Sequence, residues 1–198
     1  MRILFAASDR DLLHCYARLL SSENRTADTA FDGTQVLTKL SAERYDLLIL
    51  SQDIQRVDCR RIVGFCNGEN IPVIVLTSER PGLQTLLDGT LANAYLPLPF
   101  LPDELIALID SVRDKLSSEE TLSFGSFDVK ISSFSLSGIR ITAGELDALA
   151  ALSAGGIAGD EKNRVYINAL NAKLDSLRLP QRIKYDKENG YRLVNENE

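Results

Sequence analysis

The 198-residue sequence has little of what most catalytic and metal-binding sites are made from. It contains one histidine and three cysteines, and Cys15, Cys59 and Cys66 show no paired CxxC spacing. His14 adjoins Cys15, but both lie mid-helix among apolar residues, so a packed helix is a better interpretation than a zinc site. The sequence also lacks a P-loop, a dinucleotide-binding glycine pattern and a nucleophile–base pair. We therefore expect neither an enzyme nor a metal site, and no cofactor.

Long apolar runs are absent as well. Residues 47–50 and 73–76 have the length of strands, far below the roughly 20 residues of a membrane-spanning helix. The first residues, MRILF, lack the longer apolar core and the cleavage site of a signal peptide. The odd cysteine count argues against a disulfide framework. These absences predict a protein of the reducing cytoplasm, with no membrane partner.

The sequence has no basic excess. It holds 22 Lys and Arg against 28 Asp and Glu, a net charge of −6. Residues 121–198 are neutral overall, so the acidic excess lies in residues 1–120. A strongly basic nucleic-acid binder has a different composition. Any phosphate-binding surface must therefore be a local stripe.

What the sequence does contain is a regular alternation of short apolar runs and helical patterns. The apolar runs predict strands at residues 3–6, 26–30, 46–50, 72–76 and 94–96. The helical patterns fall at residues 9–22, 33–41, 59–66, 83–88 and 102–116. Repeated β-α units of this size predict an α/β fold with a five-stranded parallel sheet.

The pattern changes after the polar linker at residues 117–120. Residues 122–141 mostly alternate apolar with polar or small side chains, which predicts short antiparallel strands. The sequence TAGE at residues 142–145 is a capping box that opens a helix to about Ser153, ended by Gly155 and Gly156. A second helix at 164–177 and a hairpin turning at Asn189-Gly190 complete a small α+β domain.

Ser51 stands at the end of the apolar strand predicted at residues 46–50. It therefore emerges at the carboxyl edge of the parallel sheet, where open α/β folds carry out their chemistry. A carboxylate at this point could accept a phosphoryl group and hold a metal ion. Ser51 does neither well, because a neutral hydroxyl is a poor ligand for Mg²⁺.

Residues 1–117 resemble the CheY-like receiver domain of two-component response regulators. The resemblance rests on IPVIVLTS at 71–78, YLPLPF at 95–100 and PDEL at 102–105. It makes Thr77 the switch threonine and Tyr95 the aromatic switch residue, and it implies a cis Leu98–Pro99 peptide bond. Residues 121–198 are similar to the winged-helix effector of the OmpR/PhoB family, through TAGE, VYINALNAKL at 165–174 and NGYRL at 189–193.

The departures from the receiver pattern concern its charged residues. The family's acidic pair falls on Ala7 and Ser8, its phospho-acceptor on Ser51, and its phosphate-contacting lysine on Leu98. The resemblance therefore implies a pseudo-receiver without acyl-phosphate chemistry. It then serves as a scaffold and dimerisation surface.

Asp9 and Asp53 lie close to the vacated positions, so a shifted acid site is an alternative. We disfavour it because Mg²⁺ requires convergent ligands in near-octahedral geometry. Asp9 is better interpreted as the cap of the first helix.

The effector resemblance is also incomplete. Only about ten residues separate its two predicted helices, where the family has a further helix. The second helix is expected to enter a major groove, yet Asn168, Ala169 and Asn171 stand at positions that are commonly basic. The DNA-binding candidates are Arg164, Asn168, Asn171, Lys173, Lys184, Lys187 and Arg192. A solvated helix face with scattered lysines is an equally good interpretation.

The leading hypothesis is an atypical response regulator that binds DNA as a homodimer without phosphorylation. The dimer would form through the fourth and fifth receiver helices and the strand between them. The alternative is a signalling adaptor whose remnant effector domain binds another regulatory protein, or the partner subunit, and no DNA.

Overall fold

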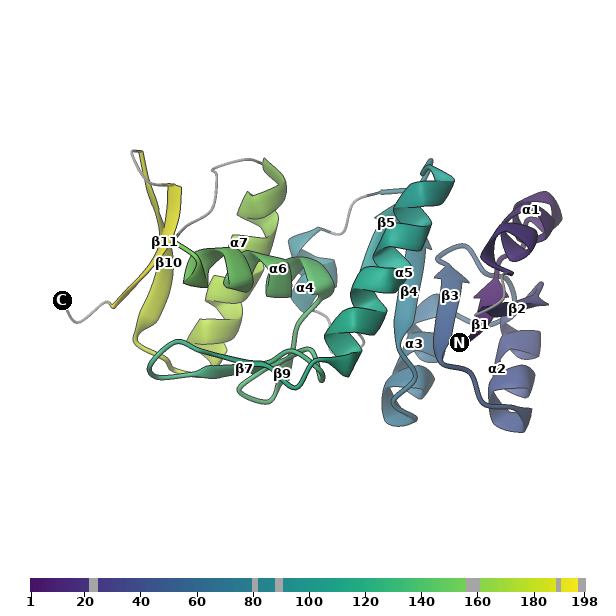
Figure 1. Ribbon diagram of the computed structural model, residues 1–198, viewed down its shortest axis with the longest axis horizontal. Helices are drawn as coiled ribbons and strands as arrows, with labels where there is room; N and C mark the ends of the chain where they lie inside the picture. Colours follow the sequence, from purple (N-terminus) through teal and green to yellow (C-terminus); the bar gives the residue numbers. More distant parts are fainter. Residues whose placement is uncertain (22–24, 80–81, 88–90, 156–160, 188–189, 196–198) are drawn as a thin grey trace. The chain divides into compact units, whose positions relative to one another are not determined.

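The computed structural model describes residues 1–21, 25–79, 82–87, 91–155, 161–187 and 190–195 (Figure 1). Their contacts divide the chain into two compact units. The first comprises Met1–Arg80 and Ala92–Ser111, and the second Pro81–Leu91 and Val112–Glu198. The long helix α5 (Pro102–Ser117) therefore contributes to both units. The predicted domain division at residues 117–121 remains a prediction.

The first unit is built on a five-stranded parallel sheet, as predicted. Its strands are β1 (Arg2–Ala6), β2 (Thr26–Ala30), β3 (Leu47–Ser51), β4 (Val73–Thr77) and β5 (Ala94–Pro97). They follow the order β2-β1-β3-β4-β5, with every neighbouring pair parallel. This is the flavodoxin-like order, in which the carboxyl ends of β1 and β3 lie side by side.

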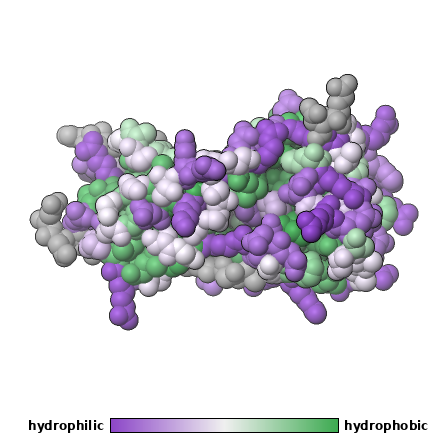
Figure 2. All heavy atoms as spheres, turned by 60° about the horizontal axis from the view of Figure 1, so that its bottom comes forward, coloured by the Kyte–Doolittle hydropathy of each residue, from purple (hydrophilic) through white to green (hydrophobic). Residues whose placement is uncertain are grey.

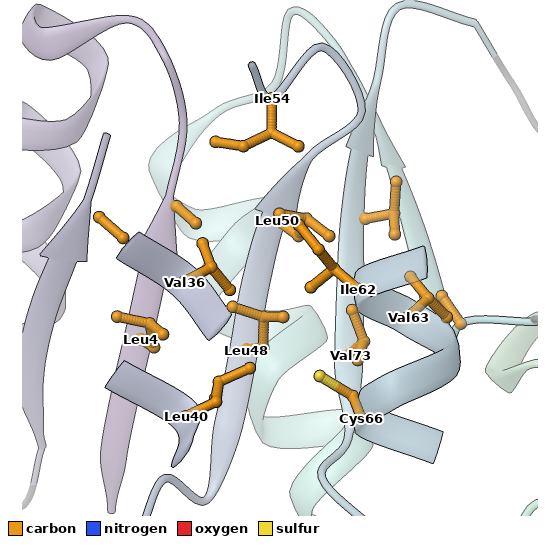
Figure 3. Close-up of a cluster of buried hydrophobic side chains, with 14 of the residues drawn as sticks. Leu4, Val36, Leu40, Leu48, Leu50, Ile54, Ile62, Val63, Cys66 and Val73 are labelled. Atoms are coloured by element: carbon orange, nitrogen blue, oxygen red, sulfur yellow. The ribbon is translucent and has the colours of Figure 1, made fainter. Parts of the chain in front are cut away.

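One face of the sheet packs against α2 (Gly33–Ala42) and α3 (Cys59–Gly68). Figure 3 shows Val36 of α2 and Ile62 of α3 meeting Leu48 and Leu50 of β3. Cys66 belongs to the same cluster, and burial raises the pKa of its thiol to about 12. A thiol kept protonated in this way behaves as an apolar core group rather than as a metal ligand.

The opposite face receives α1 (Arg10–Leu20). The ring of Tyr16 lies 6.2 Å from that of Phe5 and 5.0 Å from that of Phe100, which precedes α5. Asp9 caps α1, accepting hydrogen bonds from the backbone N–H groups of Asp11 at 2.9 Å and Leu12 at 3.1 Å. The interpretation of Asp9 as a helix cap is confirmed.

The second unit contains the predicted antiparallel strands, two helices and a hairpin. Its four-stranded sheet runs in the order β6 (Thr121–Ser123), β7 (Asp128–Lys130), β8 (Ser135–Leu136) and β9 (Ile139–Arg140). The helices are α6 (Ala143–Ser153) and α7 (Glu161–Ser176), and the hairpin is β10 (Gln181–Asp186) with β11 (Gly190–Asn195). Asn189 of the predicted turn and Gly156 after α6 lie outside the described residues.

The predicted capping box opens α6. Thr142 accepts from the backbone N–H of Glu145, and the Glu145 carboxylate accepts from the backbone N–H of Thr142 at 2.8 Å. Gly144 is required inside this turn because a Cβ atom there would overlap the ring of Tyr166 on α7. The absence of a side chain at Gly144 therefore permits α6 and α7 to pack closely.

Helix α7 has neighbours on several sides within the second unit. It contacts α6, β10 and the short helix α4 (Leu83–Leu87). Leu86 of α4 is fully buried. The structure thus groups α4 with the second unit, although in sequence α4 follows β4 of the parallel sheet in the first unit.

The surface of the described residues is mixed in polarity. Hydrophilic side chains cover much of the face drawn in Figure 2, with apolar ones between them. The large exposed apolar side chains include Leu19, Leu101 and Tyr185. None of the helices in the described part of the chain combines the length and apolar character needed to span a bilayer.

Candidate functional site

The first candidate site is the carboxyl edge of the parallel sheet. Because β1 and β3 are adjacent and parallel, their ends bring Ala7 and Ser51 to the same edge. Ala7 is buried, Ser51 is half-buried and Ser8 is exposed. The Ser8 hydroxyl accepts a hydrogen bond from the backbone N–H of Gln55 at 3.1 Å. This edge therefore presents methyl and hydroxyl groups where a phosphorylation site needs carboxylates.

The two carboxylates near this edge do not form a cluster. Asp9 is occupied in capping α1, and the exposed Asp53 lies in the loop after β3. Within the described residues, no three His, Cys, Asp or Glu side chains gather closely enough to hold a metal ion. The chemistry of the groups present at the edge therefore gives no support to a shifted acid site.

The two switch-like residues are both held in place. Thr77 is 6 % exposed, and its hydroxyl donates a hydrogen bond to the carboxamide oxygen of Gln52. Tyr95 packs against the α2–α3 core cluster, and its hydroxyl accepts from the backbone N–H of Ala92 at 3.3 Å. Leu98 is half-buried, and the Leu98–Pro99 peptide bond is cis, as the resemblance implies.

Sequence reasoning did not identify Gln52. A signal was nevertheless present, because Gln52 is the first long polar side chain after a buried parallel strand. Such a residue must emerge at the carboxyl edge of the sheet. The partner that it would find there, Thr77, is 25 residues away in sequence.

The second candidate site lies on α7 and the β10–β11 hairpin. Arg164 and Asn168 are exposed one turn apart on α7, and Lys184, Lys187 and Arg192 are exposed on the hairpin. Lys184 and Arg192 face each other across the two strands. Like charges in directly opposed positions destabilise a strand pair, and this pair concentrates positive charge on one exposed face of the hairpin.

Asn171 is a correction to the predicted set of DNA-binding residues. Its side-chain amide donates to the carbonyl of Ile183 at 2.9 Å, and its side-chain oxygen accepts from the N–H of Ile183 at 2.8 Å. Both ends of the carboxamide are therefore used to join α7 to β10. The group is not available to read an adenine edge, which needs the same donor and acceptor.

Lys173 is a second correction. Its side chain is buried, and its Nζ lies 2.6 Å from Oε1 of the fully buried Glu145. Burial raises the pKa of Glu145 and lowers that of Lys173, while the attraction between them opposes both changes. Lys173 therefore ties α7 to the capped end of α6 and does not face a phosphate.

Comparisons with known proteins show that this chain is similar to response regulators. No family model matches the chain. Response regulator MprA of Mycobacterium ulcerans (strain Agy99) is 33% identical over 128 residues, which cover 61% of this chain and 54% of the relative. MprA of Mycobacterium tuberculosis (strain ATCC 25618 / H37Rv) is 31% identical over 126 residues, with the same coverage. The chain thus spans about half the length of the curated relatives that it matches.

Solved structures match one domain or the whole chain. A two-component response regulator from Clostridium difficile matches 60% of this chain and 99% of its own, with a TM-score of 0.54 and 20% identity. DrrB of Thermotoga maritima, an OmpR/PhoB homologue, matches 98% of both chains with a TM-score of 0.56 and 20% identity. The sequence matches support a relationship to response regulators, and the second structural match shows that the chain has the two-domain fold of an OmpR/PhoB homologue.

Proposed function

We propose that this protein is an atypical response regulator that binds DNA and regulates transcription without aspartyl phosphorylation. The observation that carries this proposal is the chemistry of the sheet edge. Ala7, Ser8 and Ser51 stand where the family's acidic residues would hold Mg²⁺ and accept a phosphoryl group, and Leu98 replaces its lysine. No catalytic role and no cofactor are part of this function, and its place is the cytoplasm.

DNA binding is supported by the exposed polar groups of the second unit. Arg164 and Asn168 lie in the half of α7 that a winged helix directs toward the major groove. Lys184 and Arg192 form a cross-strand basic pair, and Lys187 follows the last residue of β10. A few lysines and arginines of this kind give modest affinity that falls steeply with salt.

Dimerisation through α4, β5 and α5 belongs to the same proposal. The contact of α4 with α7 bears directly on it, because a dimer built through α4 has to leave that contact intact or replace it. Light scattering is expected to give the mass of a dimer at micromolar concentration without any phosphodonor. A monomer under these conditions would remove dimerisation from the proposed mechanism.

The experiment that tests the proposed function is gel retardation of duplex DNA fragments by the full chain. We expect a shift near 50 mM salt that weakens by roughly tenfold or more near 200 mM. Adding Mg²⁺ with beryllofluoride should leave the affinity unchanged, since the sheet edge lacks anionic ligands for the metal. Asp53→Ala serves as the control for a shifted acid site. Beryllofluoride-dependent binding that disappears in Asp53→Ala would contradict independence from phosphorylation.

The adaptor remains a second candidate function because contacts within the second unit occupy part of the surface of α7. Lys173 and Asn171 are both engaged inside the unit, which reduces the polar surface that α7 offers to DNA. The contact between α4 and α7 also covers part of that helix. Absence of any DNA shift at low salt would favour the adaptor over the transcription regulator.

A further inference from the structure

We propose that the side chain of Gln52 is a built-in substitute for the phosphoryl group at this receiver-like site. Its carboxamide oxygen accepts the hydrogen bond of the Thr77 hydroxyl at the sheet edge where a phosphorylated receiver would carry the phosphoryl oxygens. This inference rests on the proposed function, in which no phosphoryl group ever reaches the site. The Gln52 side chain would explain how Thr77 is held in one position without a phosphoryl group.

The backbone of Gln52 is fixed by the sheet. Its N–H donates to the carbonyl of Leu76 at 2.8 Å, one step beyond the last paired residues of β3 and β4. Leu76 immediately precedes Thr77. The ladder of β3 and β4 thus brings the Gln52 side chain beside the Thr77 hydroxyl.

The hydroxyl of Thr77 has both of its roles occupied. It donates its single proton to the carboxamide oxygen of Gln52, and it accepts from the backbone N–H of Glu79 at 3.2 Å. A hydroxyl has only one proton to donate, and a buried hydroxyl without an acceptor costs free energy. Gln52 therefore removes the need for an external oxygen and fixes the start of the segment after β4.

The loop that carries Gln52 is also held at several points. The N–H of Ile54 donates to the Ser51 carbonyl at 3.2 Å, and the Gln55 carbonyl accepts from Gly33 at 2.9 Å. Ser8 accepts from the N–H of Gln55. A loop anchored to both β3 and α2 presents the Gln52 oxygen in one place, whereas a phosphoryl oxygen arrives only with a donor.

The position of Tyr95 agrees with this arrangement. Its ring packs against the core of the same unit, and its hydroxyl accepts from the N–H of Ala92. Both switch-like residues thus have hydrogen-bond partners within the protein. The receiver-like unit accordingly holds a single switch conformation, independent of any phosphodonor.

A set of Gln52 variants in the full chain tests the inference. Gln52→Met keeps the length of the side chain but has no acceptor, and Gln52→Glu keeps an acceptor oxygen. We expect the Glu79 amide, followed by NMR hydrogen exchange, to exchange about fivefold faster in Gln52→Met, the equivalent of one neutral hydrogen bond. Gln52→Glu should restore the slow exchange.

Gln55→Met is the matched control, because the side chain of Gln55 is exposed and donates a long hydrogen bond to the Asp53 carbonyl at 3.4 Å, whereas the bonds to Ser8 and Gly33 are made by its backbone. In this variant the Glu79 amide should exchange at the same rate as in the unchanged protein. Equal exchange at Glu79 in Gln52→Met and the unchanged protein would overturn the inference, as would failure of Gln52→Glu to restore it. Because this readout lies in the first unit, a lack of DNA binding would refute the transcription role and leave the Gln52 result intact.

Discussion

Replacing Lys173 with methionine is expected to unfold the second unit of the chain or to leave it only marginally stable. Glu145 is fully buried, and the ammonium of Lys173 lies 2.6 Å from its carboxylate. Removing one partner of a buried ion pair costs roughly 3–5 kcal/mol, because the remaining charge stays buried without compensation. That loss reaches the lower end of the free energy of unfolding of ordinary domains, about 5–15 kcal/mol.

The measurement is hydrogen exchange by mass spectrometry on the full chain. Peptides from α6 and α7 should lose protection in Lys173→Met, while peptides from β1 and β3 should keep it. Lys130→Met is the matched control, since Lys130 is an exposed lysine of the same unit. Replacing both partners, with Glu145→Gln added, should be less harmful than Lys173→Met alone. Equal protection in Lys173→Met and Lys130→Met would show that the pair contributes little.

The damage caused by Lys173→Met should also depend on pH in a defined direction. Burial raises the pKa of Glu145, and Lys173 supplies the main attraction that lowers it. Without Lys173 the folded pKa therefore rises further above its ordinary value of 4.5. Such a group contributes its full stability below its unfolded pKa and loses that contribution as the pH rises through the folded pKa. Lys173→Met should accordingly be least harmful near pH 4, about the unfolded pKa of a glutamate, and more harmful as the pH rises through the folded pKa of Glu145. The difference from the unchanged protein should shrink again at strongly alkaline pH, because burial lowers the pKa of Lys173 and its ammonium is then lost in the unchanged protein too.

Reversing the charges of the hairpin pair is expected to abolish most DNA binding. Lys184 and Arg192 are directly opposed on exposed positions of β10 and β11. In Lys184→Glu/Arg192→Glu, two phosphate contacts are lost and two repulsive carboxylates take their place. We expect an affinity at least roughly tenfold lower, and a salt dependence that is shallower by about two released counterions. Gel retardation over a series of salt concentrations measures both quantities.

A control with the same change in net charge is necessary for this test. Lys130→Glu/Arg61→Glu alters the total charge equally at exposed positions that belong neither to the hairpin nor to α7. Circular dichroism should show both double variants folded, since all four side chains are exposed. If the control loses as much affinity as the hairpin variant, binding depends on overall charge and the hairpin is not a specific contact.

The secondary structure was largely predictable because its signals are local. The strand at residues 26–30 and the opening of α6 at Thr142 agree with the structure to the residue. Helix α7 begins at Glu161, earlier than the predicted residue 164. The reason is that residues 161–163 carry no apolar side chain and so add nothing to the periodicity.

The assignment of individual polar side chains was less predictable. Lys173 and Asn171 have the residue types of a DNA-binding surface, yet both are used inside the second unit. Their roles depend on Glu145 and Ile183, which belong to other elements of the chain. The grouping of α4 with α7 likewise depends on contacts that no local pattern reports.

The sequence alone determined the order of strands and helices, the caps, and the absence of acidic groups at Ala7, Ser8 and Ser51. These properties follow from residue type and from periodicities of two and 3.6 residues, which operate over a few neighbouring positions. Only the tertiary structure decided that Gln52 meets Thr77 and that Lys173 is buried against Glu145. Such pairings form between residues distant in the chain, because it is the packing of whole elements that determines which polar groups lose water and must find a protein partner.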